Sequence, residues 1–208
     1  MKIENYRYIK SFQLPNGWRE EKPVTGIATS IVRSFSPPGN TAVKLEFFYR
    51  GLPLDEKSSK SFRGALKLAP RLMFDNSSTN KLESSDARLI CDLEGVLGNV
   101  GNNQISNTET GFSGPSFSLD RLDALIWNNR PLLAARGWFI DPESAERRSA
   151  FCGFFIDANP NEKNCSVEEI YLEAEAEAED LYLQYMPELE KCLHSIEWST
   201  VRSGSDRE

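Results

Sequence analysis

Alternating hydrophobic and polar positions run through residues 6–50 and predict β-strands there. Residues 8–14 (YIKSFQL) alternate and stop at a Pro-Asn-Gly turn, and residues 24–35 are rich in β-branched side chains. Residues 41–51 (TAVKLEFFYRG) alternate again, and Pro-Pro-Gly-Asn at 37–40 separates these last two segments. We therefore predict that they pair as an antiparallel hairpin.

Between residues 54 and 98 the apolar residues recur at the spacing of helices instead of alternating as in strands. One face of the first predicted helix carries four apolar residues: Phe62, Leu66, Ala69 and Leu72. Residues 85–98 predict a second helix, with Ser85 as N-cap and Gly98 as C-cap. Residues 99–116 contain almost no apolar side chains, which indicates a polar surface loop.

Strand patterns return after this loop. Residues 122–127 and 130–141 flank Asn128 and Asn129, a pair typical of tight hairpin turns, and residues 147–158 predict a further strand.

The segment 167–194 alternates acid and alanine, yet we interpret it as a long C-terminal helix. Alanine and glutamate are good helix formers and poor strand formers, and Ser166 with Glu169 matches a capping box. Pro187 predicts a kink or a break near Met186. The acids would then form a solvated helix face or, alternatively, a docking surface for a basic partner.

This order of elements predicts an α+β fold in which helices flank an antiparallel β-sheet. We expect one domain over residues 1–199 with a polar loop insertion at 99–116, followed by a disordered tail at 200–208.

Composition narrows the classes of function. The 208 residues carry a net charge of −7, so binding to nucleic acid, which requires many phosphate contacts by Lys and Arg, is not expected. No stretch of 18 apolar residues predicts a membrane span, and residues 1–12 lack the apolar core of a signal peptide. The four cysteines are scattered, which is typical of reduced, buried thiols. We expect a cytoplasmic protein.

No catalytic, metal or cofactor site is predicted. The only histidine, His194, has no nucleophile placed beside it, and no His/Cys set has the spacing of zinc ligands. The glycines at 95, 98 and 101 end a predicted helix rather than open one, unlike a phosphate-binding loop. Arg50 and Arg130 lie at strand ends, where they can bind a carboxylate or stack on a neighbouring aromatic ring. With Trp127 and Trp138 they are the candidate binding residues.

Three short segments resemble the PsbP-like superfamily: FQLPNGW at 12–18, FFYRG at 47–51 and LHSIEWS at 193–199. That superfamily includes the photosystem extrinsic P subunit, a Ran-binding nuclear-import factor and type VI secretion effector chaperones. The resemblance implies an α/β/α sandwich and a protein that works by binding other proteins without catalysis.

Our leading hypothesis is therefore a protein-binding module: an adaptor, a secretion chaperone or an immunity-type inhibitor. The alternative is an enzyme or small-ligand-binding protein that uses arginines and carboxylates in a sheet cleft. A third hypothesis places all specificity in the 99–116 loop. The sequence leaves the partner and the oligomeric state open.

Overall fold

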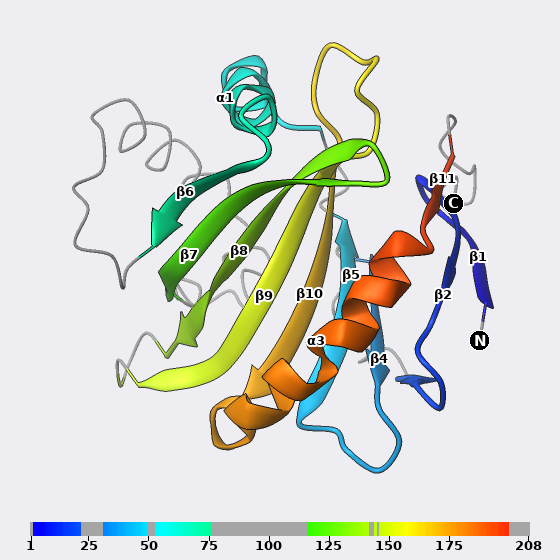
Figure 1. Cartoon of the computed structure of the whole chain (residues 1–208), viewed down its shortest axis with the longest axis vertical. Helices are drawn as coiled ribbons and strands as arrows, with labels where there is room; N and C mark the ends of the chain where they lie inside the picture. The colour runs from blue at the N-terminus through cyan, green and yellow to red at the C-terminus, as the bar shows by residue number, and fades with distance from the viewer. Residues whose placement is uncertain are drawn as a thin grey trace, which may run out of the picture.

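A computed structural model describes residues 2–21, 31–49, 53–75, 116–141, 144 and 146–199 of the chain (Figure 1). These residues form strands, two α-helices and one turn of 3-10 helix. In chain order the elements are β1 (Lys2–Tyr6), β2 (Ile9–Gln13), β3 (Arg19–Glu20), β4 (Ile31–Ser36), β5 (Val43–Tyr49), α1 (Glu56–Leu66), β6 (Arg71–Asp75), β7 (Ser116–Trp127), β8 (Arg130–Ile140), β9 (Arg147–Asp157), β10 (Val167–Glu175), the 3-10 turn (Ala176–Ala178), α3 (Glu179–His194) and β11 (Glu197–Trp198).

The strands form two antiparallel sheets. The larger has the order β3-β4-β5-β10-β9-β8-β7-β6, and the smaller has the order β1-β2-β11. The predicted mixed α+β class and its antiparallel sheet are therefore confirmed. The predicted hairpins are also present, because β4 pairs with β5 and β7 pairs with β8. Asn128 and Asn129 join the second hairpin with φ angles of 48° and 61°, the conformation of a type I′ turn.

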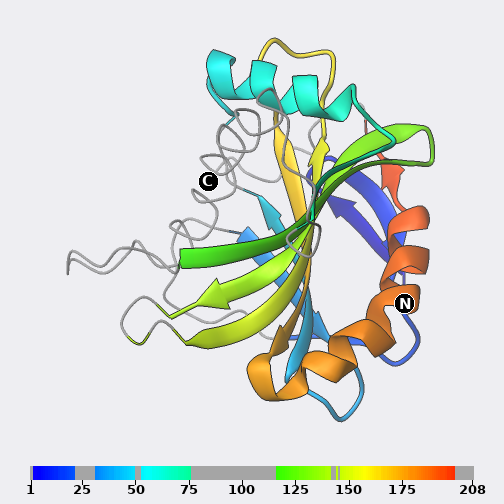
Figure 2. The ribbon, with the colours of Figure 1, turned by 60° about the vertical axis from the view of Figure 1, so that its left-hand side comes forward.

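Side chains alternate between the two faces of the large sheet, and each face has its own hydrophobic core. The residues of α3 and of the small sheet pack on one face, against Phe47, Phe154 and Leu172. The residues of α1 pack on the other face, against Leu133 and Phe155. Figure 2 shows the curved sheet between the two helices.

The first predicted helix is shorter than its apolar pattern suggested. Helix α1 ends at Leu66, and Leu72 belongs to strand β6 instead. Pro70 explains the difference, because a proline disfavours the helical conformation of the residue before it and cannot donate a backbone hydrogen bond.

The prediction of a helix from residue 167 was wrong for its first half. Residues Val167–Glu175 form β10, in the middle of the sheet between β5 and β9. Ile170 and Leu172 are fully buried on the α3 face, and Tyr171 is buried on the other. Hydrogen bonds to two neighbouring strands and burial of both faces outweigh the helix propensity of alanine and glutamate.

The helix prediction holds from Glu179 onward. Helix α3 continues through Pro187 to His194 without a break, and Figure 2 shows its axis bending along its length. A bend is the expected effect of a proline inside a helix, since its ring crowds the preceding turn. Neither described helix is long and apolar enough to cross a membrane.

Several predictions lie outside the described residues: the helix at 85–98, residues 99–115 of the polar loop, the tail at 200–208, and Arg50. Ser116, the last residue of the predicted loop, already belongs to β7.

Candidate ligand-binding site

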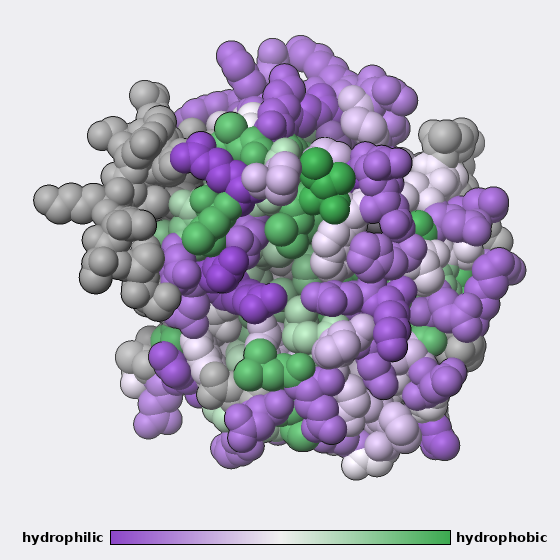
Figure 3. Space-filling model, in the orientation of Figure 1, coloured by the Kyte–Doolittle hydropathy of each residue, from purple (hydrophilic) through white to green (hydrophobic). Residues whose placement is uncertain are grey.

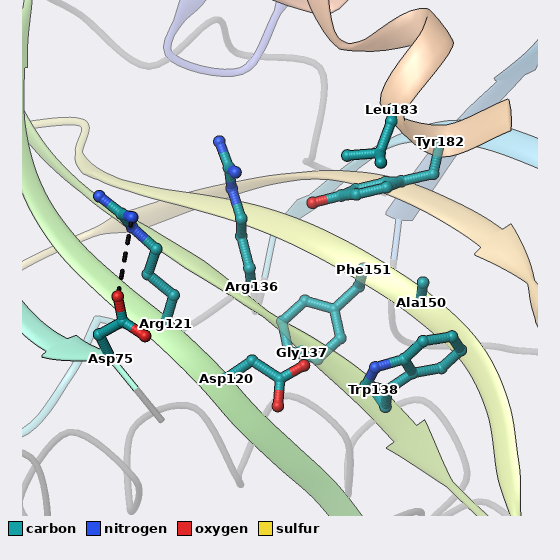
Figure 4. Close-up of a pocket in the computed structure, with 10 residues that line it drawn as sticks. All are labelled: Asp75, Asp120, Arg121, Arg136, Gly137, Trp138, Ala150, Phe151, Tyr182 and Leu183. Carbon is teal, nitrogen blue, oxygen red and sulfur yellow. Dashed lines mark ion pairs between the residues drawn. The ribbon is translucent and has the colours of Figure 1, made fainter. Parts of the chain in front are cut away.

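A pocket of about 480 Å³ opens on the face of the large sheet that carries α3. Strands β6, β7, β8 and β9 form its floor and α3 forms one wall (Figure 4). The polar side chains that line it are Asp75, Asp120, Arg121, Arg136 and Tyr182. It is therefore a hollow of mixed charge, built on rigid strands rather than on loops.

A β-bulge sets the positions of the two arginines. Between Leu119 and Arg121 the β7–β8 register shifts, so that Asp120 has no partner residue on β8. Beyond the bulge, Arg121 and Arg136 are direct cross-strand partners. Two like charges opposite each other destabilise a sheet unless other groups neutralise them.

Arg121 is neutralised within the chain. Its Nε donates to Asp123 Oδ2 at 2.6 Å, and its second amino nitrogen donates to Asp123 Oδ1 at 3.0 Å. Asp75 lies further away, with 4.0 Å between its Oδ2 and Arg121 Nη1. The hydrogen bond that Arg121 donates to Asp123 raises the pKa of Arg121. Arg121 is thus held by two carboxylates.

Arg136 differs from Arg121, because no described carboxylate lies within ion-pair distance of it. It is exposed, and Figure 4 shows its guanidinium between Arg121 and the hydroxyl of Tyr182, while the Asp120 carboxylate points away from it. Burial raises the pKa of Tyr182, so this hydroxyl stays protonated and can donate a hydrogen bond. Arg136 and Tyr182 together offer donors to an anion.

Apolar and aromatic side chains surround these donors. Trp138 lies in the same pocket, and Arg147 stacks over its indole at 4.4 Å. Leu183 on α3 is 60% exposed, and Leu72 on β6, opposite Asp123, is 48% exposed. Figure 3 shows separate hydrophobic patches among hydrophilic side chains on this face. The pocket can therefore make both polar and apolar contacts.

Two of the residues predicted from the sequence lie elsewhere. Arg130 stacks over Trp198 at 4.5 Å, and the Trp127 ring stacks on His194 at 5.0 Å. Asn128 also donates to the His194 carbonyl oxygen at 2.6 Å. These contacts join the β7–β8 hairpin to β11 and to the end of α3.

The hollow beside Arg130 measures only about 20 Å³, enough for little more than one water molecule. Burial lowers the pKa of Arg130, and its Nη1 is buried without an acceptor among the described residues. The geometry thus favours the alternative of an arginine stacked on an aromatic ring, with a structural role.

Of the three candidate binding residues that the structure describes, only Trp138 lies in the pocket, and Arg121, Arg136 and Tyr182 were not predicted from the sequence. One signal was available in the sequence: Arg136 interrupts the apolar run of residues 131–140. A charged residue inside an apolar strand is unusual and indicates either a paired charge or a functional side chain. Nothing in the sequence showed that Arg121 would lie opposite Arg136.

The three described cysteines offer no activated nucleophile. Cys152, Cys165 and Cys192 are buried, and burial raises the pKa of Cys152 to about 11 and those of the other two to about 12. Thiols in that state are protonated at neutral pH and react slowly. Among the described residues no three His, Cys, Asp or Glu side chains are grouped so that they could hold a metal ion.

No protein-family model matches this chain, and no curated protein matches it.

Proposed function

We propose that this protein is a non-enzymatic binding module whose partner docks on the pocket face between α3 and β6. The observation that carries the proposal is the composition of this face, where Arg136, Trp138 and Tyr182 share one pocket. Arginine, tryptophan and tyrosine are the residues that contribute most binding energy at protein interfaces. The exposed Leu183 and Leu72 supply apolar contact area on either side of it.

In this proposal the module is a cytoplasmic adaptor, secretion chaperone or immunity-type inhibitor with a PsbP-like α/β/α arrangement. The antiparallel sheet with helices packed in both of its cores supports that arrangement. The protonated state of the described thiols supports a role without covalent catalysis.

Site-specific photo-crosslinking tests the proposal. A benzophenone amino acid replaces Leu183, and in a matched control it replaces Lys163, whose side chain is 77% exposed and lies outside the pocket. Both proteins are irradiated in the cells that normally produce the chain. We expect a discrete crosslinked protein with the probe at 183 and none with the probe at 163. Equal crosslinking at both positions, or none at 183, would overturn the proposal.

The alternative is a small-ligand-binding protein, and one observation favours it: polar groups of both charges converge in a pocket large enough for a metabolite. Native mass spectrometry of the protein purified from the same cells separates the two functions. A retained molecule of less than about 1 kDa, lost in R136Q, would support the alternative, since pockets of this size take ligands of that class.

A further inference from the structure

We infer that the pocket recognises a carboxylate side chain within an acidic, otherwise apolar peptide segment, and that Arg136 is the residue that binds it. This inference deepens the proposed function and rests on it.

The two arginines of the pocket differ in how their charges are balanced. Arg121 is engaged by Asp123 through two hydrogen bonds and faces Asp75 at 4.0 Å. Arg136, directly opposite Arg121 on the neighbouring strand, meets no carboxylate among the described residues. Asp120 also lines the pocket, but its carboxylate points away from Arg136 (Figure 4). A partner carboxylate would balance the charge of Arg136 and gain a charge-assisted hydrogen bond. The guanidinium of Arg136 is exposed, so a ligand can reach it without unfolding the sheet.

Exposed leucines lie on both sides of the two arginines. Leu72 lies on β6 at one side of the two arginines, and Leu183 lies on α3 at the other. Apolar residues on both sides suit a segment that continues in both directions past the carboxylate. We therefore assign a Glu or Asp side chain of an internal segment, rather than a terminal carboxylate, to Arg136.

Helix α3 offers a hydrogen-bond acceptor to the backbone of that segment. Pro187 lies in the interior of α3 and has no N–H to donate to the carbonyl oxygen of Leu183, four residues earlier. This carbonyl therefore lacks its regular helical donor. It lies next to the exposed Leu183 side chain, where it can accept a hydrogen bond from a partner N–H.

The test is an NMR titration of the full-length, ¹⁵N-labelled protein with two synthetic peptides. They are acetyl-Leu-Ala-Glu-Ala-Leu-amide and the same peptide with Gln in place of Glu. The probes are the Nε–H signal of Arg136 and the indole N–H signal of Trp138, assigned from R136K and W138F. We expect both signals to shift with the Glu peptide, and the Gln peptide to bind about tenfold more weakly, since one hydrogen bond to a charged group is lost.

Variants connect the effect to one residue. R136Q should bind the Glu peptide no better than the Gln peptide, whereas R136K, which keeps the charge, should fall between the two. R19Q is the matched control, because Arg19 is exposed on β3 at the opposite edge of the sheet. It should leave both affinities unchanged. Circular dichroism checks that each variant is folded.

Three results would overturn the inference. Equal binding of the two peptides would show that only apolar contacts matter. Tighter binding of inorganic phosphate than of the Glu peptide would identify a site for a small anion. If neither peptide binds but a partner crosslinks at Leu183, the specificity for an acidic segment is refuted, whereas the proposed docking function is still supported. Loss of that crosslinking, by contrast, counts against the proposed function itself.

Discussion

Glu46 provides the most direct quantitative test of the structure. It lies on β5, opposite Tyr171 of β10 and Ser34 of β4. Burial, followed by the nearby charge of Glu173, raises the pKa of the Glu46 carboxyl to about 7, although Lys44 and Ser34 act in the opposite direction. In the unfolded chain the carboxyl has its ordinary pKa near 4.5. Folding therefore favours the protonated form of Glu46.

The sign of the pH dependence follows from this difference. The folded protein holds the Glu46 proton more tightly than the unfolded chain, so the free energy of unfolding falls as pH rises from about 4.5 to about 7. The difference between a pKa of about 7 and one near 4.5, at about 1.4 kcal/mol per pH unit, corresponds to about 3.5 kcal/mol. This is an upper bound, because part of the side chain reaches solvent.

The substitution Glu46→Gln removes the titrating group and keeps its size. We expect the variant and the natural protein to be about equally stable near pH 4.5, and the variant to be more stable above about pH 7, by at most ~3.5 kcal/mol. Urea unfolding followed by tryptophan fluorescence, repeated at several pH values between these limits, measures the difference directly. Titrating groups that do not interact with Glu46 cancel in the comparison of the two proteins.

Glu197→Gln is a control of opposite sign. Glu197 is exposed and pairs with Lys10 at 3.3 Å, and the hydrogen bond from Lys10 lowers its pKa. A lowered carboxyl pKa stabilises the fold above the unfolded pKa and loses that effect at low pH. This variant should therefore be less stable near neutral pH and equal to the natural protein in acid. Parallel stability curves for Glu46→Gln and the natural protein across the whole pH range would refute our account of the buried carboxyl.

Three further predictions concern the rest of the fold. Gly137→Ala should destabilise by about 2 kcal/mol or more in thermal unfolding, because its Cβ would lie 2.0 Å from the Ser118 carbonyl oxygen at the bulge. Gly64→Ala in α1, with open space around its Cβ, should instead stabilise by about 0.5–1 kcal/mol, so equal effects would contradict the bulge geometry. Arg63→Ala should lower stability by about 1–3 kcal/mol and speed hydrogen exchange in residues 158–165, because the Arg63 Nε donates to the buried Asp157 at 2.8 Å. Unchanged exchange in these residues would refute this expectation. In the native protein no more than one of the four thiols should react quickly with Ellman's reagent, and a second fast thiol would disagree with the burial of the three described ones.

Local patterns predicted those parts of the fold whose conformation depends on neighbouring residues. The Asn-Asn turn fixed the β7–β8 hairpin, because both residues adopt positive φ angles. Alternation likewise identified β5, which is paired with β4 across the Pro-Pro-Gly-Asn turn. In each case the deciding interactions lie within one turn or one pair of strands.

Local sequence patterns did not predict strand β10. Its alanines and glutamates favour a helix, yet two neighbouring strands hold it in the sheet. Strand β5 is distant in the sequence, and a loop separates β9 from β10. The same limit applies to the candidate site. Tyr182 comes from α3, and the pairing of Arg121 with Arg136 depends on a one-residue bulge.

The sequence by itself determined the mixed α+β class, the antiparallel hairpins and helix α3, because periodicity and turn chemistry act over short distances. Only the tertiary structure decided which charges meet. Arg121 is held by Asp123, whereas Arg136 meets no carboxylate among the described residues, and that difference arises from strand register and from the packing of α3 across the sheet. A shift of one residue would turn either arginine to the other face, so the pocket exists only in the folded chain.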